Sequence, residues 1–347
     1  MRTFVLFSIM RTHFIKKQTL SVMIERSNKM RIHDNFIFAL TPSFTTGFSL
    51  SMHRTRTEML SGLTSLGIVG DKMNQNVIRL GFVGDVMIGR GIDAILPFSV
   101  EGTIHESYMK DANGYVRLAV RENGPLPHAE LEEKRSSYIW GDLIEDLKSP
   151  DALIVNLETS LTRSNNWDQN KGIHYRSHPN NVESLSAIGV KAATLANNHV
   201  LDWGEEGLKE TMRTLDVAGI SYAGAGIDEK IAKKPTFLTI EVPAVADSTR
   251  GEEIVTVAVL AIGFPSAGVP TDWHASKNQC GVNVEEEVNE EVAKRAFESI
   301  QKRAKELRTV PDITIVSLHW GSSSTVLYSF RYILNAILMS QQIPDVP

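Results

Sequence analysis

The stretch VIRLGFVGDVMIGR at 77–90 indicates the fold class, because its apolar run 78–83 is followed directly by Gly84 and Asp85. Three later apolar runs are also followed by polar residues, namely 151–155 (DALIV), 190–195 (VKAATL) and 312–318 (DITIVSL). Short apolar runs that alternate with helical segments are typical of buried parallel strands in an α/β protein. We therefore predict parallel strands whose carboxyl ends share one edge, where polar residues distant in sequence converge.

The segments between these runs predict the remaining elements. Apolar spacing and breakers favour helices at 87–94, 137–148, 182–188 (with Asn181 as its cap), 204–218 and 285–307, the last beginning with the acidic run 285–287. The apolar runs 236–242 and 254–262 flank a polar turn and predict a hairpin that joins the sheet. Residues 99–136 show no sustained period, so we expect a long loop over the edge that carries the polar residues.

Composition and charge divide the chain into two parts. Its 347 residues, 42% hydrophobic and 22% charged, suffice for a full core. Residues 1–77 carry ten Lys and Arg against four Asp and Glu, net +6, and no sustained period, so we predict a poorly ordered extension there and a folded domain over 78–347. The remainder carries 26 basic against 37 acidic residues, net −11, within a formal total of −5. An acidic body disfavours nucleic acid as a partner and suits divalent cations.

Several protein classes are disfavoured by simple features. Cys280 is the single cysteine, so an intrachain disulfide is impossible and the compartment stays open, as does the oligomeric state. The apolar run 4–10 is short and closed by Arg11, so a disordered extension is favoured over a secretory signal or a transit segment. No run reaches the roughly 18 apolar residues of a membrane helix, so we predict no membrane span. Walker loops, nucleophile elbows and paired zinc cysteines do not occur in the sequence.

Four residues near the predicted strand ends are candidate metal ligands: Asp85, Glu158, Asn198 and His319. Carboxylate, amide and imidazole groups are ligands that hard and borderline divalent cations accept. Each residue also has a structural alternative. Asp85 suits an Asx turn or a helix cap, Glu158 a cap, Asn198 the entry to the helix at 204–218, and His319 a satisfied histidine at a strand end.

Two further residues suit proton transfer, and two suit anion binding. His199 is the candidate proton donor to a leaving group, and Asp202, three residues on, is placed to orient that imidazole and hold its tautomer. Arg90 and Arg176 are candidates for binding an anionic substrate, because a guanidinium pairs with carboxylate or phosphate oxygens. The alternative for Arg176 is a solvated loop side chain.

With these residues in place, the chain resembles the CapA-like family, the poly-gamma-glutamate or capsule-synthesis proteins related to metallophosphoesterases. The resemblance runs from about residue 78 to 321 on the motifs GDVMIGR (84–90), VNLETSL (155–161), LANNHVLDWGEEGLKET (195–211), YAGAG (222–226) and SLHWG (317–321). It implies the layered αββα sandwich of metal-dependent phosphatases. It also implies a divalent metal (Mn, Zn, Fe or Mg) held by the carboxylates of Asp85 and Glu158, the amide of Asn198 and the imidazole of His319, with His199 as the proton donor.

Two features depart from the wider pattern. Met87 stands where the wider metallophosphoesterases have a histidine, a difference that CapA-like proteins generally share. The thioether of methionine is a poor ligand for these cations. The chain also ends 28 residues after His319 (347 minus 319) without the glycine- and histidine-rich segment that follows in the family, so we expect a sandwich that lacks its last portion.

The resemblance implies a metal-dependent hydrolase of the phosphoesterase type. Its expected substrate is an anionic polymer or a phosphorylated small molecule. The alternative is a non-catalytic binding or scaffold protein of the same fold. A remote third reading is an enzyme of amide or peptide bonds that acts on polyglutamate.

Overall fold

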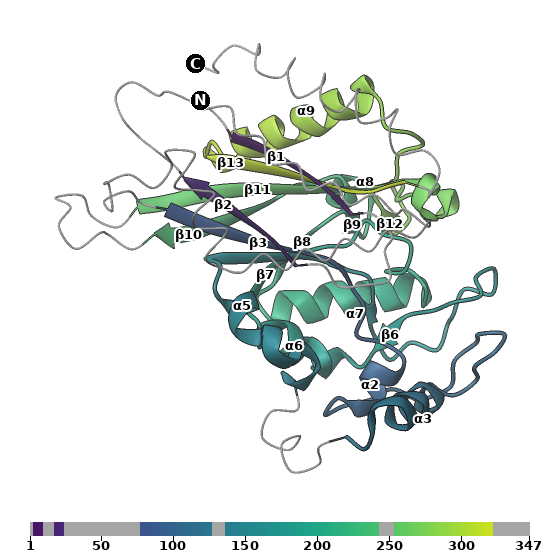
Figure 1. Cartoon of the computed structure of the whole chain (residues 1–347). Helices are drawn as coiled ribbons and strands as arrows, with labels where there is room; N and C mark the ends of the chain where they lie inside the picture. The colour runs from purple at the N-terminus through teal and green to yellow at the C-terminus, as the bar shows by residue number, and fades with distance from the viewer. Residues whose placement is uncertain (1–2, 10–16, 24–76, 127–135, 243–252, 322–347) are drawn as a thin grey trace, which may run out of the picture.

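Two facing sheets with helices on both outer sides make up the computed structural model, which describes residues 3–9, 17–23, 77–126, 136–242 and 253–321 (Figure 1). The five-stranded sheet has the order β2 (Lys17–Met23), β3 (Val77–Val86), β4 (Ala152–Leu157), β7 (Val190–Thr194) and β8 (Ser221–Ala223). The four-stranded sheet has the order β1 (Thr3–Ile9), β13 (Ile313–His319), β11 (Glu253–Gly263) and β10 (Thr236–Val242).

The two sheets bury a common apolar layer between them. One face of each of the central strands β3, β4, β11 and β13 points to this layer, because side chains in a strand alternate between its faces. Leu80 and Ile154 from the five-stranded sheet join Val257 and Ile315 from the four-stranded sheet in one buried cluster. This packing brings the carboxyl ends of β3 and β13 to the same end of the molecule.

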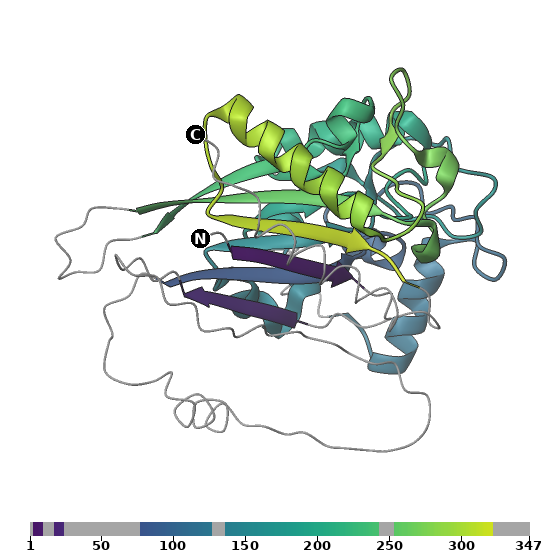
Figure 2. The same ribbon diagram turned by 90° about the horizontal axis from the view of Figure 1, so that it is seen from above.

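Helices cover the outer faces and complete four layers. In α7 (Gly204–Val217), Leu208 and Leu215 pack into the buried cluster on the outer face of the five-stranded sheet. In α9 (Glu290–Leu307), Val292 and Ile300 pack against the outer face of the four-stranded sheet. Figure 2 shows α9 lying along its sheet. The predicted αββα sandwich is thereby confirmed.

Shorter elements connect these layers. The α-helical ones are α2 (Gly91–Ile95), α3 (Ala112–Asn123), α5 (Ile144–Lys148), α6 (Glu183–Ser186) and α8 (Glu229–Ala232). The 3-10 helices are Tyr138–Leu143, Pro179–Val182, Pro265–Ala267 and Thr271–Trp273. Two pairs of short strands complete the connections: β5 (Ser160–Leu161) with β6 (Arg176–Ser177), and β9 (Ala225–Gly226) with β12 (Gly281–Val282). Within the described ranges, every helix is too short or too polar to span a membrane.

The predicted strands are present, but they do not all belong to one sheet. β3, β4 and β7 are parallel neighbours, whereas β13 is a parallel neighbour of β11 in the second sheet. The hairpin predicted from 236–242 and 254–262 is the antiparallel pair β10 and β11. The prediction that all four strand ends lie at one edge of a single sheet is therefore wrong, because the polar residues come from the edges of two stacked sheets.

The loop predicted over 99–136 is wrong in part, because α3 lies within it. Asp111 starts this helix by accepting a hydrogen bond from the backbone N–H of Asn113 at 2.9 Å, which satisfies one of the free amides of the first turn. Gly124 follows the helix with φ 84, a conformation that favours glycine. A polar helix with a weak apolar stripe is hard to recognise in a sequence, and here the start of the helix is set by the cap residue Asp111.

Four predicted helices differ in detail. The segment 137–148 is divided at Gly141, where φ is 53. Asn181 is not a cap, because it lies inside the 3-10 helix Pro179–Val182, where the imidazole of His178 accepts from the backbone N–H of Asn180 at 3.2 Å. The cap position of α6 is Val182. The last helix begins at Glu290, with the side chain of Asn289 as its cap, so the acidic run 285–287 precedes it. The first helix likewise begins later than predicted, at Gly91.

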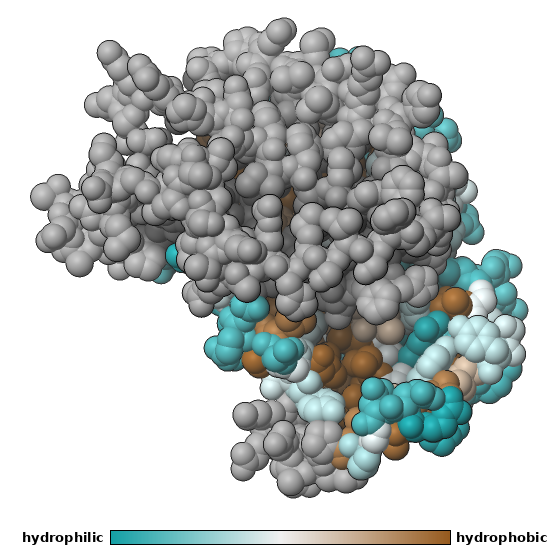
Figure 3. All heavy atoms as spheres, viewed as in Figure 1, coloured by the Kyte–Doolittle hydropathy of each residue, from teal (hydrophilic) through white to brown (hydrophobic). Residues whose placement is uncertain are grey.

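Part of the predicted N-terminal extension contributes strands. β1 pairs with β13 and β2 pairs with β3, and both lie within 1–77. Residues 10–16 and 24–76 lie outside the described residues, as does the tail 322–347, so the predicted boundary at 77 and the expected incomplete end stay predictions. Figure 3 shows hydrophobic atoms exposed beside the largely hydrophilic region of α3.

Candidate functional site

Asp85 lies at the end of β3, where the pairing register with β4 shifts. Its neighbour across the sheet is Asn156, whose Nδ2 donates to Asp85 Oδ1 at 2.7 Å. Asn156 Oδ1 in turn accepts from Asn197 Nδ2 at 3.0 Å, and both asparagines are buried. Asp85 does not cap α2, since Arg90 occupies that position. The amide chain instead fixes the Asp85 carboxylate relative to the segment that follows β7.

His319 brings the second sheet to this carboxylate. Its Nε2 lies 3.0 Å from Asn198 Oδ1, and its Nδ1 lies 3.9 Å from Asp85 Oδ1. Because an amide oxygen is an acceptor, Nε2 carries a proton, and the other ring nitrogen, Nδ1, faces the carboxylate. A carboxylate and an imidazole nitrogen in this arrangement can hold a proton or a cation between them.

A tight turn after β7 holds His199. Asn197 Oδ1 accepts from the backbone N–H groups of His199 and Val200, each at 3.0 Å. His199 Nδ1 lies 2.7 Å from Asp202 Oδ2, and both side chains are buried. The carboxylate keeps the proton on Nδ1, so Nε2, which lies 3.7 Å from Glu158 Oε1, is the atom that can exchange a proton with a substrate. We call His199 and Asp202 the dyad.

Two residues of the loop before β6 support the dyad, and our sequence analysis did not identify them. The Lys171 ammonium donates to Asp202 Oδ1 and to the backbone carbonyl of Asn198. The backbone N–H of Tyr175 donates to Asp202 Oδ2 at 2.8 Å, and the Tyr175 ring stacks on the His199 imidazole at 3.9 Å between centroids. A lysine and a tyrosine in a polar loop carry no sequence signal for such contacts, which depend on how the loop folds back.

Arg90 is held by internal partners near the dyad. Its backbone has φ 55 and ψ −129, a conformation that residues other than glycine rarely adopt. Its Nε lies 2.6 Å from a carboxylate oxygen of the buried Glu106, and its guanidinium lies over the rings of Tyr115 and Tyr175. Burial and the Glu106 carboxylate raise the pKa of Tyr115, whose hydroxyl donates to that carboxylate. Arg90 therefore shares the Tyr175 ring with His199, and its substrate role stays a prediction.

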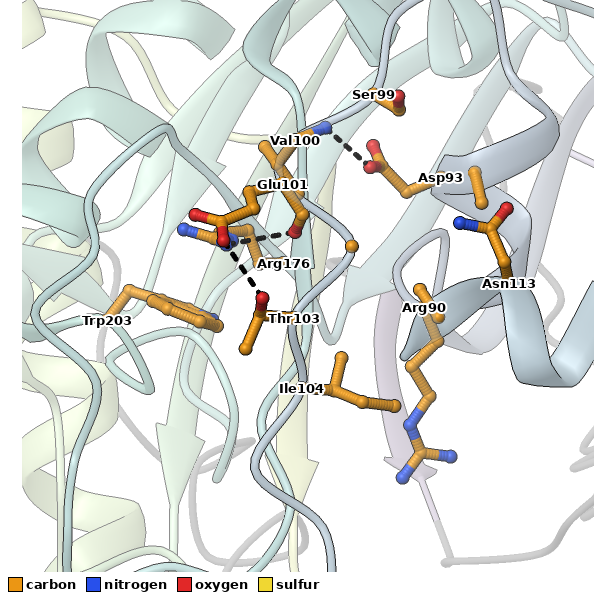
Figure 4. Close-up of a pocket in the computed structure, with 13 residues that line it drawn as sticks. Arg90, Asp93, Ser99, Val100, Glu101, Thr103, Ile104, Asn113, Arg176 and Trp203 are labelled. Atoms are coloured by element: carbon orange, nitrogen blue, oxygen red, sulfur yellow. Dashed lines mark hydrogen bonds between the residues drawn. The ribbon is translucent and has the colours of Figure 1, made fainter. Parts of the chain in front are cut away.

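Arg176 faces a cavity beside the dyad. Its Nη1 donates to the backbone carbonyl of Ser164 at 2.6 Å and to Asn165 Oδ1 at 2.7 Å, and its Nη2 donates to the carbonyl of Glu101 at 3.3 Å. The guanidinium lies 3.8 Å from the centre of the Trp203 ring. Figure 4 shows both side chains at the wall of a cavity of about 160 Å³. Because Arg176 is only 6% exposed, the solvated alternative is wrong.

The carboxylate of Asp85 and Nδ1 of His319 are chemically suited to one divalent cation between them. Asn198 Oδ1 lies at the opposite edge of the His319 ring, beside Nε2, so this amide would have to turn to reach the same cation. Glu158 lies on the His199 side of this group. In the part of the chain that the structure describes, no group of three or more His, Cys, Asp or Glu side chains is arranged to hold a metal ion. The described residues thus suit one site with few protein donors better than a two-metal centre.

The fold and the site define an α/β sandwich protein with a polar site at the ends of its central strands. Within that class, the chain belongs to the family described as bacterial capsule synthesis protein PGA_cap, whose model matches residues 79–327. The CapA-like membership predicted from the motifs is thereby confirmed.

Three relatives illustrate the family. A probable polyglutamine synthesis accessory protein of Mycobacterium tuberculosis is 36% identical over 252 residues, which cover 72% of this chain and 62% of that protein. The capsule biosynthesis protein CapA of Bacillus anthracis is 25% identical over 244 residues, covering 70% of this chain and 46% of the relative. The PGA biosynthesis protein CapA of Bacillus subtilis is 22% identical over 249 residues, covering 72% and 50%. The chain therefore matches about half to three fifths of the length of these relatives.

Proposed function

We propose that this chain is a metal-dependent hydrolase of the phosphoesterase type that acts on an anionic polymer, or its phosphorylated precursor, in capsule or poly-gamma-glutamate metabolism. The observation that carries the proposal is the buried dyad of His199 and Asp202, placed beside Glu158 and near the pair of Asp85 and His319. The printed names of the relatives support the link to capsule or polyglutamate synthesis.

Each residue of the dyad has a defined role in this proposal. Asp202 accepts the Nδ1 proton of His199 in a hydrogen bond and so directs Nε2 to the leaving-group oxygen. In the imidazolium form, Nε2 also carries a proton, and His199 donates that proton to the leaving group and becomes the neutral imidazole. Lys171 balances the buried charge of Asp202, and Tyr175 fixes the plane of the imidazole by stacking. These contacts hold the ring in one orientation with Nε2 toward the substrate, which is what proton donation to a poor leaving group needs.

A divalent cation would be held by Asp85 and by Nδ1 of His319, with Asn198 as a further ligand once its amide turns from His319 Nε2. When bound, it would supply positive charge that stabilises the charge developing on a phosphoryl group. The Asp85 carboxylate and His319 Nδ1, which face each other across 3.9 Å, support a cation at this place because each can donate a lone pair to it.

A chromogenic phosphodiester assay tests the dyad. We expect bis(p-nitrophenyl) phosphate to be hydrolysed by the full chain in the presence of Mn or Zn, with kcat lowered by about 100-fold or more in His199→Gln and in Asp202→Asn. His274→Gln, a partly buried histidine that bonds a backbone carbonyl, is the matched control and should retain activity. Equal turnover by His199→Gln and the wild type would refute the role of the dyad.

Calorimetric titration with Mn and Zn tests the cation without relying on turnover. The wild type should take up the metal, and Asp85→Asn should bind it more weakly, because the amide lacks the negative charge of the carboxylate. Asp216→Asn, an exposed aspartate on α7, should bind like the wild type. Absence of metal uptake by the wild type would refute this part of the proposal.

A second candidate function is a non-catalytic binding or scaffold protein of the same fold. The small number of metal donors brought together by the described residues favours it. A wild-type protein that neither takes up metal nor hydrolyses the phosphodiester, yet is folded by circular dichroism, would support this candidate over the hydrolase.

A further inference from the structure

In each of two pairs of neighbouring residues, 175–176 and 202–203, the first residue contacts His199 of the dyad and the second lines the cavity beside it. Tyr175 and Asp202 contact His199, whereas the residues that follow them, Arg176 and Trp203, line the cavity. Arg176 lies in β6, where successive side chains point in opposite directions. The cavity and the dyad are therefore separate spaces built on the same two backbone segments.

The positive charge of Arg176 lacks a direct counter-charge at this wall. A guanidinium has five N–H donors, and three bonds are made here, all to neutral oxygens of Ser164, Asn165 and Glu101. No carboxylate of the described residues forms an ion pair with it. Burial lowers the pKa of Arg176, and the carboxylates of Asp93 and Glu101 oppose this from a distance. A buried cation is ordinarily paired, so this one favours an anion in the cavity.

Trp203 adds a second donor to the same wall. Its side chain is 2% exposed, and its indole Nε1 has no hydrogen-bond partner among the described residues. An indole N–H can only donate, so it calls for an acceptor that the described residues do not provide. In Figure 4 the Trp203 ring extends from the backbone just before α7 toward Thr103, beneath Arg176.

The acids at the cavity do not supply that acceptor. Asp93 is committed to four hydrogen bonds, from Ser177, His178, Asn181 and Val100. Glu101 is exposed, and its carboxylate accepts from the hydroxyl of Thr103.

We propose that this cavity is a second anion site, in which Arg176 and Trp203 bind an oxyanion group of the carboxylate or phosphate class. A guanidinium and an indole N–H both donate to such oxygens, and the bond from the guanidinium is charge-assisted. The cavity of about 160 Å³ exceeds the roughly 30 Å³ of one water molecule several-fold, so a carboxylate or phosphate group fits with water around it. The site is defined by binding and does not depend on turnover at the dyad.

Nuclear magnetic resonance of the full chain tests this site directly. Inorganic phosphate and glutarate are titrated separately at constant ionic strength, which distinguishes a phosphate from a carboxylate ligand. The readout is the indole N–H resonance of Trp203, assigned by its absence from Trp203→Phe. We expect a saturable shift with at least one of the two anions in the millimolar range.

Charge variants of exposed wall residues keep the test independent of folding. Thr103→Glu places a negative charge at the wall and should weaken binding about 3- to 10-fold relative to the matched neutral variant Thr103→Gln. Glu101→Gln removes a competing charge and should strengthen binding by a similar factor. His199→Gln should bind the anion like the wild type, even where it has lost turnover.

Three results would overturn the proposal. One is a Trp203 resonance that neither anion shifts saturably, and another is equal affinity in Thr103→Glu and Thr103→Gln. The third is loss of binding in His199→Gln, which would place the anion at the dyad. Loss of turnover alone in His199→Gln concerns the hydrolase and leaves the anion site standing.

Discussion

Asp93 accepts four hydrogen bonds, from Val100 and from the segment 177–181, and replacing it tests how the fold builds the wall of the cavity. Its Oδ1 accepts from the Ser177 hydroxyl and the backbone N–H of His178, both at 2.7 Å, and from Asn181 Nδ2 at 2.8 Å. Its Oδ2 accepts from the backbone N–H of Val100 at 2.8 Å. The residue is 3% exposed, so water does not readily take over these bonds.

The expected loss in Asp93→Ala follows from the donors left behind. The Asn181 amide keeps its bonds to the carbonyl of Phe98 and to the Ser177 hydroxyl. The backbone N–H groups of Val100 and His178 lose the carboxylate, and each unsatisfied buried amide costs about 1–3 kcal/mol. Removal of a buried charge offsets part of this penalty. We therefore expect the free energy of unfolding to fall by about 2–5 kcal/mol.

Urea unfolding of the full chain, followed by circular dichroism at pH 7, measures this loss. Asp228→Ala is the matched control, since Asp228 caps α8 through one bond to the backbone N–H of Ile231 at 2.9 Å. Loss of such a cap costs about 1 kcal/mol. If Asp93→Ala loses no more stability than Asp228→Ala, the reasoning about the four-fold acceptor is refuted.

The titration of Asp93 predicts a direction with pH. Burial raises the pKa of its carboxyl above the usual 3.8, although the hydrogen bonds that it accepts oppose the shift. The folded state then holds the proton more tightly than the unfolded state. The resulting stabilisation is complete below pH 3.8 and is lost as the pH rises through the raised pKa. The stability of the wild type relative to Asp93→Asn should therefore fall across this range, and a rise would contradict the shift.

Three further predictions concern the core and the dyad. Burial raises the pKa of the Cys280 thiol to about 11, so Ellman's reagent at pH 8 should label the folded protein far more slowly than the urea-unfolded one; equal rates would contradict this. Leu208→Ala, at a fully buried position of α7, should lower the free energy of unfolding in urea by about 3 kcal/mol, while Val217→Ala, 90% exposed on the same helix, should change it by less than about 0.5 kcal/mol. Comparable losses would rule out the assigned packing. Tyr175→Leu removes the ring stacked on His199 and should lower kcat for the phosphodiester about 10-fold or more with a smaller change in KM, whereas an unchanged kcat would show that the stacking does not position the imidazole.

Much of the fold was readable from the sequence because the relevant signals are local. Apolar runs that end in polar residues marked the ends of β3, β4, β7 and β13, and a helical apolar stripe marked α7. α3 was missed because its stripe is weak and its start depends on one side-chain cap. Local patterns report which face of an element is apolar, and they report caps less reliably.

The candidate site was predictable where its residues are close in sequence, and not where a loop returns to it. The spacing of His199 and Asp202 within one turn was enough to expect their contact, since three residues of a turn bring two side chains together. Lys171 and Tyr175 were missed, because their contacts with the dyad arise where a loop folds back over it. Arg176 was identified as a possible anion ligand, but its burial under Glu101 and over Trp203 was not.

The sequence by itself determined the class of fold, the strand ends that carry Asp85 and His199, and the family of the chain, because strand periodicity and contiguous motifs are properties of neighbouring residues. Only the tertiary structure decided that His319 reaches Asp85 from a different sheet, that a loop supplies the counter-charge to Asp202, and that Arg176 faces a cavity of its own. These outcomes depend on how two sheets stack and on where loops return. Such long-range packing is set by the whole core, and no local pattern encodes it.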